Sequence, residues 1–274
     1  MLIGIHCHLD HHDFNNGREI IIENAKKANV KVILTAGINP ETNRKTLALA
    51  EKYDIVKACL GIYPIETLQK DIEQGQLPLK ENKFDIDEEI GFIKKNKNKI
   101  MAVGEVGLDY SQGENIKSQK ELFQKMIDLA EQISKPIIIH SRKAESDCIE
   151  ILQSSNLKKI IMHCFCGKKS LVKKIIDSGW FLTAPTSIIR SMQFQENVGL
   201  CPITQLFCET DAPYLTPYKD TGNLPKQISA PIDMGKRNEP AFIIESYKKI
   251  AEIKKMELQE VVNNIWMNWQ KVFD

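Results

Sequence analysis

The sequence has no long hydrophobic run and no excess of charge of either sign. None of its apolar stretches approaches the roughly 18 residues that a membrane-spanning helix needs, and its first residues lack the basic and apolar segments of a secretory signal. Lysine and arginine (37) almost balance aspartate and glutamate (36), which leaves a formal net charge of +1. We therefore expect a soluble protein with no membrane partner and with no overall field that attracts acidic molecules.

The seven cysteines are odd in number and follow no regular spacing. This pattern excludes a disulfide framework, and it lacks the second cysteine pair that a zinc finger needs. Reduced thiols are typical of the cytoplasm, which is the predicted location. No feature of the sequence indicates an obligate protein partner.

Apolar runs of strand length alternate with helix-like segments along nearly the whole chain. Expected strands cover residues 2–9, 32–37, 55–62, 100–108, 137–140, 159–165, 180–182 and 205–211, and expected helices cover 18–29, 40–53, 118–133, 144–153, 240–253 and 257–273. Eight apolar strands alternating with helices predict an α/β TIM (β/α)8 barrel, as a single domain over residues 1–274. An open doubly wound sheet is the alternative.

Two stretches resemble insertions into this pattern. Residues 66–98 are polar and rich in lysine, and residues 215–236 are rich in proline and glycine without periodicity. Because each follows a strand, we expect both to be loops over the carboxyl-end face of the barrel, where functional residues usually lie.

Residues that can bind a metal stand at or near the carboxyl ends of five expected strands. They are His6, His8, Glu105, His140, His163 and Asp211. Any one of these histidines alone is more often a hydrogen-bonded core or loop residue, but strand ends converge in a barrel, so the joint pattern favours a metal site. Six ligands are too many for one tetrahedral zinc with an open position. They suit two divalent ions (Mg²⁺, Mn²⁺ or Zn²⁺), which Glu105 could bridge.

Three further polar residues lie close to these strand ends. His11 and His12 fall in a polar loop between Asp10 and Asp13, where we expect solvated side chains. Arg142 follows His140 by two residues and can hold a phosphate oxygen with its planar guanidinium. An ion pair with a nearby carboxylate is the alternative for Arg142.

At these positions the sequence resembles the TatD family of metal-dependent deoxyribonucleases, within the wider amidohydrolase-like barrels. The matching segments are His-Cys-His-Leu (6–9), Gly-Glu-Val-Gly-Leu-Asp-Tyr (104–110), Ile-His-Ser-Arg (139–142), His-Cys-Phe-Cys-Gly (163–167), Glu-Thr-Asp-Ala-Pro-Tyr-Leu (209–215) and Arg-Asn-Glu-Pro (237–240). The resemblance implies a two-metal hydrolase of phosphodiester bonds in DNA. It also implies that the six residues above are the ligands, with Asp211 as general base and Glu105 as a second catalytic carboxylate.

The sequence departs from the family pattern at three places. Gly4 stands where the family usually has an aspartate, Tyr63 precedes Pro64 where it usually has a histidine, and Ile65 and Glu66 follow where a further histidine is usual. These departures concern residues around the substrate, so two alternatives stay open. One is hydrolysis of another ester or amide bond, such as an aminoacyl-tRNA ester, although Glu105 replaces the bridging lysine of the amidohydrolases proper. The other is a barrel that binds metal or nucleic acid without catalysis.

Overall fold

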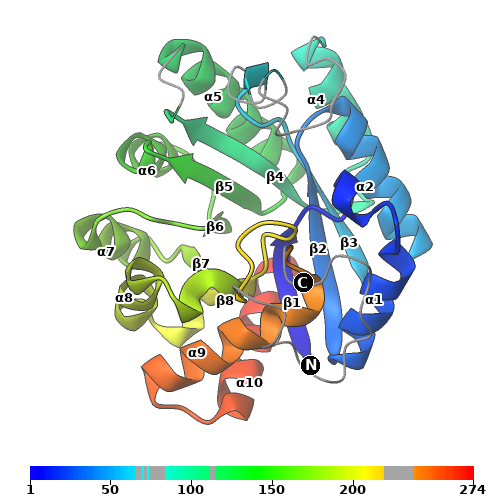
Figure 1. Cartoon of the computed structure of the whole chain (residues 1–274). Helices are drawn as coiled ribbons and strands as arrows, with labels where there is room; N and C mark the ends of the chain where they lie inside the picture. Colours follow the sequence, from blue (N-terminus) through cyan, green and yellow to red (C-terminus); the bar gives the residue numbers. More distant parts are fainter. Residues whose placement is uncertain (66–68, 71–72, 74–83, 112–114, 219–236) are drawn as a thin grey trace. The chain divides into compact units, whose positions relative to one another are not determined.

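Eight strands form one sheet in which strand order follows chain order (Figure 1). The structure is a computed structural model that describes residues 1–65, 69–70, 73, 84–111, 115–218 and 237–274. The strands are β1 (Leu2–Cys7), β2 (Val30–Gly37), β3 (Val56–Leu60), β4 (Ile100–Asp109), β5 (Ile137–Arg142), β6 (Ile160–Met162), β7 (Phe181–Pro185) and β8 (Leu206–Glu209). The chain after β8 bonds back to β1, because the amides of Thr210 and Asp211 donate to the carbonyl of His6. This is the topology of a TIM barrel, and the predicted fold class is confirmed.

Helices connect the strands at most positions. They are α1 (Arg18–Lys27), α2 (Pro40–Lys52), α4 (Ile86–Lys95), α5 (Ile116–Ile133), α6 (Glu145–Gln153), α7 (Lys169–Asp177), α8 (Met192–Leu200), α9 (Ile244–Lys254) and α10 (Leu258–Phe273). Short 3-10 segments cover His12–Phe14, Thr186–Ile189, Ile203–Gln205 and Pro240–Ile243. The predicted helices are all present, whereas α4, α7 and α8 were not predicted.

The expectation of a loop over residues 66–98 is wrong for its second half. Asp85 starts α4, because its side chain accepts hydrogen bonds from the amides of Asp87 (2.8 Å) and Glu88 (3.0 Å). Ile93 is buried, and Lys94 lies in the last turn, where a positive charge favours the helix dipole. Residues 66–68, 71–72 and 74–83, and residues 219–236 of the second expected loop, lie outside the described residues.

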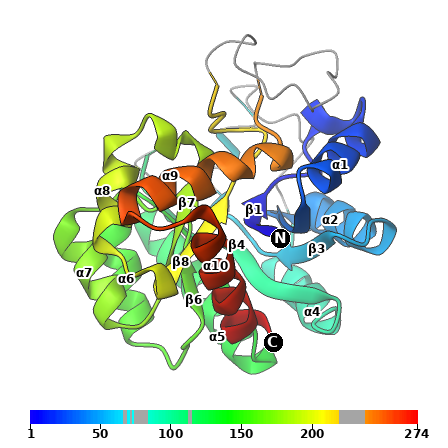
Figure 2. The ribbon, with the colours of Figure 1, turned by 90° about the horizontal axis from the view of Figure 1, so that it is seen from below.

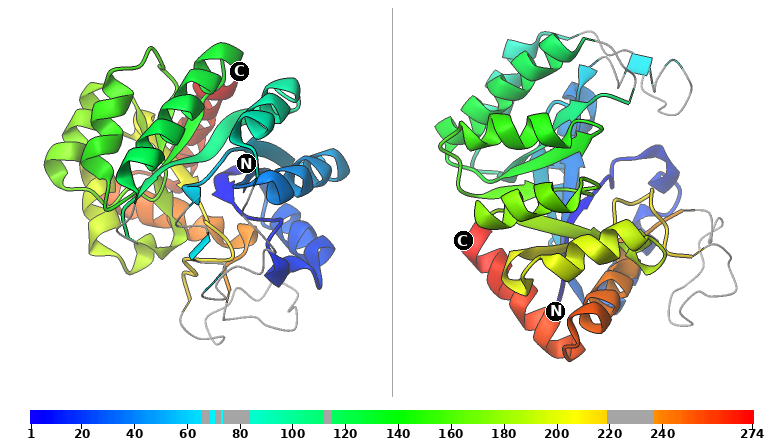
Figure 3. Two further views of the ribbon diagram at one scale, coloured as in Figure 1. Left: turned by 90° about the horizontal axis from the view of Figure 1, so that it is seen from above. Right: turned by 90° about the vertical axis from the view of Figure 1, so that its left-hand side faces the viewer.

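The chain divides into two compact units, which we describe separately. The first unit comprises Met1–Thr35, Leu49–Lys57 and Leu182–Asp274. It contains β1, β8 and the two last helices; α10 contacts α9, β1 and β8 (Figure 2). The second unit comprises Ala36–Ala48 and Ala58–Phe181. In it, β4, β5 and β6 pair in parallel, and α6 and α7 contact each other (Figure 3).

The first strand is buried along its whole length, which explains its continuous apolar sequence. Its one small residue makes room for a neighbour from the C-terminal part of the chain. A Cβ atom at Gly4 would lie 2.8 Å from Cδ1 of Ile243, whose side chain is itself buried. The absence of a side chain at residue 4 therefore lets the 3-10 segment Pro240–Ile243 pack against β1.

None of the helices in the described part of the chain is long and apolar enough to cross a membrane.

Candidate metal centre

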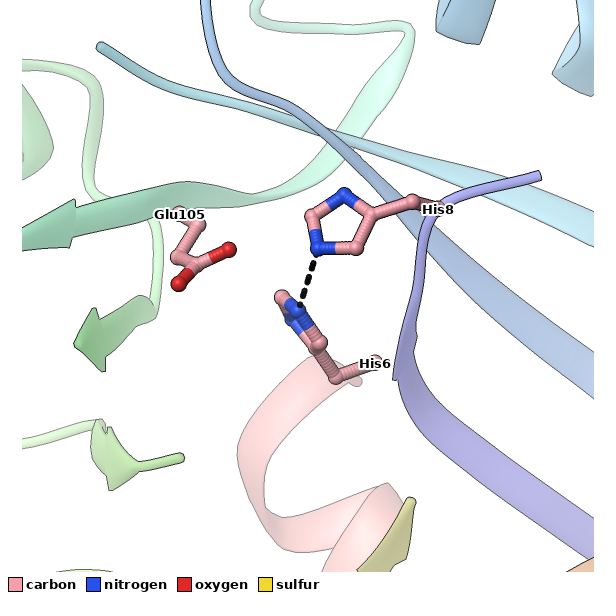
Figure 4. A group of neighbouring side chains, drawn as sticks. All are labelled: His6, His8 and Glu105. Atoms are coloured by element: carbon pink, nitrogen blue, oxygen red, sulfur yellow. Dashed lines mark hydrogen bonds between the residues drawn. The ribbon is translucent and has the colours of Figure 1, made fainter. Parts of the chain in front are cut away.

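The first unit brings together His6, His8 and Asp211. His6 belongs to β1, and His8 follows directly after it, where its amide donates to the carbonyl of Ala212 (2.8 Å). The two imidazoles turn toward each other, with their Nε2 atoms 3.3 Å apart (Figure 4). Oδ1 of Asp211 lies 3.5 Å from Nε2 of His6 and 3.6 Å from Nε2 of His8. Three atoms that can each bind a metal thus face one another at the same end of β1 and β8.

These separations fit one divalent ion. Ligand atoms that bind an ion tetrahedrally at about 2.0–2.1 Å lie about 3.4 Å from each other. The three separations of 3.3, 3.5 and 3.6 Å are close to that value. Two imidazole nitrogens and one carboxylate oxygen are also the donors that Zn²⁺ and similar ions take in catalytic sites.

The second unit brings together Glu105, His140 and His163. Oε1 of Glu105 lies 2.8 Å from Nδ1 of His140 and 3.6 Å from Nε2 of His163. Each of the three residues offers a ligand atom within 4.8 Å of the others. Glu105 is buried inside β4, and an unpaired buried carboxylate is costly, so the two imidazoles stabilise it there.

Close approach of β4 to β5 positions this second group. Gly107 pairs with His140 in the sheet register. A Cβ atom at Gly107 would lie 2.0 Å from the carbonyl oxygen of His140, and its φ of +149° disfavours other residues. Glycine at this position is therefore required for His140 to sit beside Glu105.

A carboxylate and a tyrosine hydroxyl contact the other nitrogen of His140. Oδ2 of Asp109 lies 3.2 Å from Nε2 of His140, and the Tyr63 hydroxyl lies 3.0 Å from the same nitrogen. Burial lowers the pKa of His140, but its hydrogen bonds to Asp109 and Glu105 outweigh burial and raise the pKa to about 9. Burial raises the pKa of Asp109, but the bonds to His140 and Ser111 outweigh it and hold the pKa below its usual range. The two carboxylates thus favour positive charge at this position, either as a proton on His140 or as a cation that replaces that proton.

The six ligands predicted from the sequence therefore occur as two groups of three, one in each unit. The strands β6 and β8 are shorter than expected, so His163 and Asp211 follow the strand ends instead of lying within them. Arg142 ends β5, and its exposed side chain makes no ion pair with any residue of the described ranges. Its expected contact with phosphate stays a prediction.

The aromatic rings of His11, His12 and Tyr214 form a rim next to the group of ligands in the first unit. The expectation that His11 is solvated is wrong, because its side chain is only 8% exposed. Its Nε2 atom lies 3.3 Å from the hydroxyl of Tyr214, and its ring lies beside that of His12. Burial lowers the pKa of His11 to about 4, helped by the charges of His12 and His8 and opposed by Asp13.

Sequence reasoning missed the roles of Asp109 and Glu209. Asp109 ends β4 within the Gly-Leu-Asp-Tyr segment, and its position at a strand end is the signal that could have identified it. Glu209 is buried in β8 and accepts a hydrogen bond from the hydroxyl of Thr183 (2.6 Å). Neither contact follows from sequence spacing alone, because each partner comes from a distant part of the chain.

Comparisons with known proteins match this chain over nearly its whole length. The family model "TatD related DNase" matches residues 3–274. Deoxyribonuclease TATDN3 from Homo sapiens is 33% identical over 278 residues, covering 99% of this chain and 94% of that protein. An uncharacterized metal-dependent hydrolase from Methanocaldococcus jannaschii is 32% identical, covering 99% of this chain and 96% of that protein. A TatD family hydrolase from Entamoeba histolytica has the same fold, with a TM-score of 0.82 and 22% identity over 99% of this chain and 97% of that one.

Proposed function

Because the chain belongs to the TatD-related DNase family, we propose that it is a divalent-metal-dependent hydrolase that cleaves phosphodiester bonds in DNA. The observation that carries the proposal is the geometry of the metal-binding residues. His6, His8 and Asp211 hold their ligand atoms 3.3–3.6 Å apart, and Oε1 of Glu105 lies 2.8 Å from Nδ1 of His140 and 3.6 Å from Nε2 of His163.

We assign one divalent ion to each group of ligands. Each group stands at the carboxyl ends of strands of one TIM-barrel sheet, and the active sites of TIM barrels are built from such ends. Divalent ions bound there would offset charge on the phosphodiester and make water a stronger nucleophile.

The protein's own residues supply proton transfer and substrate binding. Asp211 would accept a proton from the attacking water, since its Oδ1 atom already faces both imidazoles of the first group. Arg142 has an exposed guanidinium at the end of β5, which suits two hydrogen bonds to phosphate oxygens. As water attacks, negative charge develops on the phosphodiester. The proton transfer to Asp211 and the hydrogen bonds from Arg142 would both lower the free energy of this charged state.

We further propose that the protein works in the cytoplasm. All seven cysteines are free thiols, which supports a reducing compartment.

The proposal is tested on metal-free protein prepared with EDTA. A labelled single-stranded DNA is incubated with the protein alone and after addition of Mg²⁺, Mn²⁺ or Zn²⁺. We expect cleavage only with added metal, and at least a hundredfold loss in Asp211→Asn. The matched control is Asp177→Asn, which changes an exposed aspartate at the end of α7.

An ester substrate, an aminoacyl-tRNA, is tested in parallel with the DNA. Metal-dependent hydrolysis of the ester without cleavage of DNA would replace the proposed substrate with a carboxylic ester. Metal-dependent binding of DNA without cleavage would assign the barrel to a binding role.

A further inference from the structure

One aromatic ring is exposed beside the first group of metal-binding residues. Tyr214 is 43% exposed, and the other large apolar side chains that are exposed in the described ranges are aliphatic (Met1, Ile20, Ile116, Met192, Leu200 and Met267). An exposed ring is unusual in this chain, and its position next to His8 makes it a candidate for substrate contact.

The backbone and the hydroxyl group both hold this ring in place. The amide of Tyr214 donates to the carbonyl of Asp211 (2.8 Å), which ties the ring to the proposed general base. At the other end, its hydroxyl lies 3.3 Å from Nε2 of His11. A ring fixed at both ends loses little conformational entropy when a ligand packs against it.

The loop that carries Tyr214 is itself fixed by Asn238. The amide of Asn238 donates to the carbonyl of Pro213 (2.8 Å), and its side chain donates to the carbonyl of Thr210 (2.6 Å). Asn238 is fully buried. Buried hydrogen bonds of the loop therefore set the position of the ring, and contacts of the exposed part of the ring are not needed to hold it there.

The neighbouring imidazoles meet the ring edge to face. The ring centroid of Tyr214 lies 6.1 Å from that of His8 at an interplanar angle of 71°, and 5.6 Å from that of His11 at 73°. Neither imidazole is stacked on the phenol ring. The exposed part of the ring offers surface on which a flat partner can stack, and any nucleobase is such a partner.

We propose that Tyr214 is a stacking platform for a nucleobase of the DNA strand, an inference that rests on the proposed function. In a nucleotide, the base and the phosphate are joined by a single sugar. A base stacked on Tyr214 thus brings a neighbouring phosphate toward His8 and Asp211. The ring positions the strand and takes no part in proton transfer.

The experiment combines changes at the ring with changes in the substrate. Single strands are prepared with one abasic residue at each position in turn, and cleavage by wild type, Tyr214→Phe and Tyr214→Ala is compared with cleavage of the intact strand. On the intact strand, we expect Tyr214→Ala to lower kcat/KM about 10- to 100-fold, mainly through KM. Tyr214→Phe keeps the ring and stays within about threefold of wild type.

The decisive result is the dependence on the base. At one abasic position wild type should lose activity, and Tyr214→Ala should lose nothing further there, because the stacking partner is already absent. An equal loss from Tyr214→Ala on every strand would mean that the ring supports the fold of the site, and it would overturn the inference. No loss on any strand would overturn it too. Met192→Ala, which removes an exposed side chain on α8, is the control for a change in surface apolarity.

Failure of the proposed function gives a different result. If wild type cleaves no strand in any metal, the proposed activity is wrong, and fluorescence anisotropy of strand binding then tests the ring by itself. A loss of affinity in Tyr214→Ala that disappears with one abasic strand still supports stacking. Equal affinities of wild type and variant for the intact strand contradict it.

Discussion

The Tyr63 hydroxyl donates a 2.8 Å hydrogen bond to Oδ2 of Asp109, the same oxygen that lies 3.2 Å from Nε2 of His140. The tyrosine completes a partly buried chain of contacts that runs through His140 to Glu105. A partner that orients a metal-binding histidine also raises the affinity of the site for its ion. We therefore predict that Tyr63 positions His140 within the second group.

Tyr63→Phe should weaken metal activation without abolishing it. We expect the metal concentration for half-maximal activity to rise about tenfold, because Asp109 and His140 lose one shared hydrogen bond but keep each other. The measurement is DNA cleavage against metal concentration. Tyr53→Phe is the matched control, since it removes a 2.9 Å hydrogen bond to Glu19 at the surface. An unchanged activation curve in Tyr63→Phe would show that its hydroxyl plays no part in the site.

Metal content should follow the division into two groups of ligands. Wild type is expected to bind two divalent ions per chain, and His8→Ala and His163→Ala one each, because each change removes a ligand from a different group. Native mass spectrometry or elemental analysis after dialysis gives the stoichiometry. His12→Ala, in the neighbouring rim, should keep both ions. Loss of both ions in His8→Ala would mean that neither ion binds without the other.

Gly107→Ala should destabilise the protein and disturb the position of His140. The new methyl group would lie 2.0 Å from the carbonyl oxygen of His140, and we expect a loss of about 2–4 kcal/mol in the free energy of unfolding. Gly91→Ala on α4 is the opposite case, because its Cβ would meet no atom within 4 Å. That helix should gain roughly 0.5–1 kcal/mol. Thermal melts of both variants check the pair, and equal melting temperatures would contradict the packing argument.

His11 should make stability fall with acid. Its folded-state pKa of about 4 lies below the ordinary value of 6.5, so the unfolded chain binds more protons between these values. The contribution of His11 is complete above about pH 6.5 and is lost as the pH falls toward about 4, by up to about 3 kcal/mol. The groups that face the ring are Asp13, His12, His8 and Tyr214.

Denaturant melts of metal-free protein between about pH 4 and 7 test this dependence. In His11→Asn the fall in stability should be shallower than in wild type, and in His12→Asn, which changes the exposed neighbour, it should be unchanged. Parallel curves for wild type and His11→Asn would rule out His11 as the source of the pH dependence.

The strands and the clustering of the candidate ligands could be predicted because both depend on local pattern. Strands of a parallel barrel are covered on both faces, so they read as continuous apolar runs, and a polar residue at the end of such a run is conspicuous. His6, Glu105, His140 and Asp211 were identified in this way, and the family match confirms the class of protein that they indicated. The metals themselves and the catalytic roles remain proposals.

The missed helices and contacts depend on features that local pattern does not contain. The apolar residues of α7 stand at helical spacing, but the helix spans only nine residues, fewer than the window of about 11 over which helical periodicity is usually read. The bond between Tyr63 and Asp109 joins residues 46 positions apart, and the bond between Tyr214 and His11 joins residues 203 apart. Only the folded chain brings these pairs together.

The fit between Gly4 and Ile243 couples two positions that are distant in the chain. A Cβ atom at residue 4 would lie against the Cδ1 methyl group of a buried isoleucine, so this methyl group would have to turn away to admit it. A larger residue at position 4 should therefore be tolerated better when residue 243 is smaller, and the effects of the two changes on stability should not be additive.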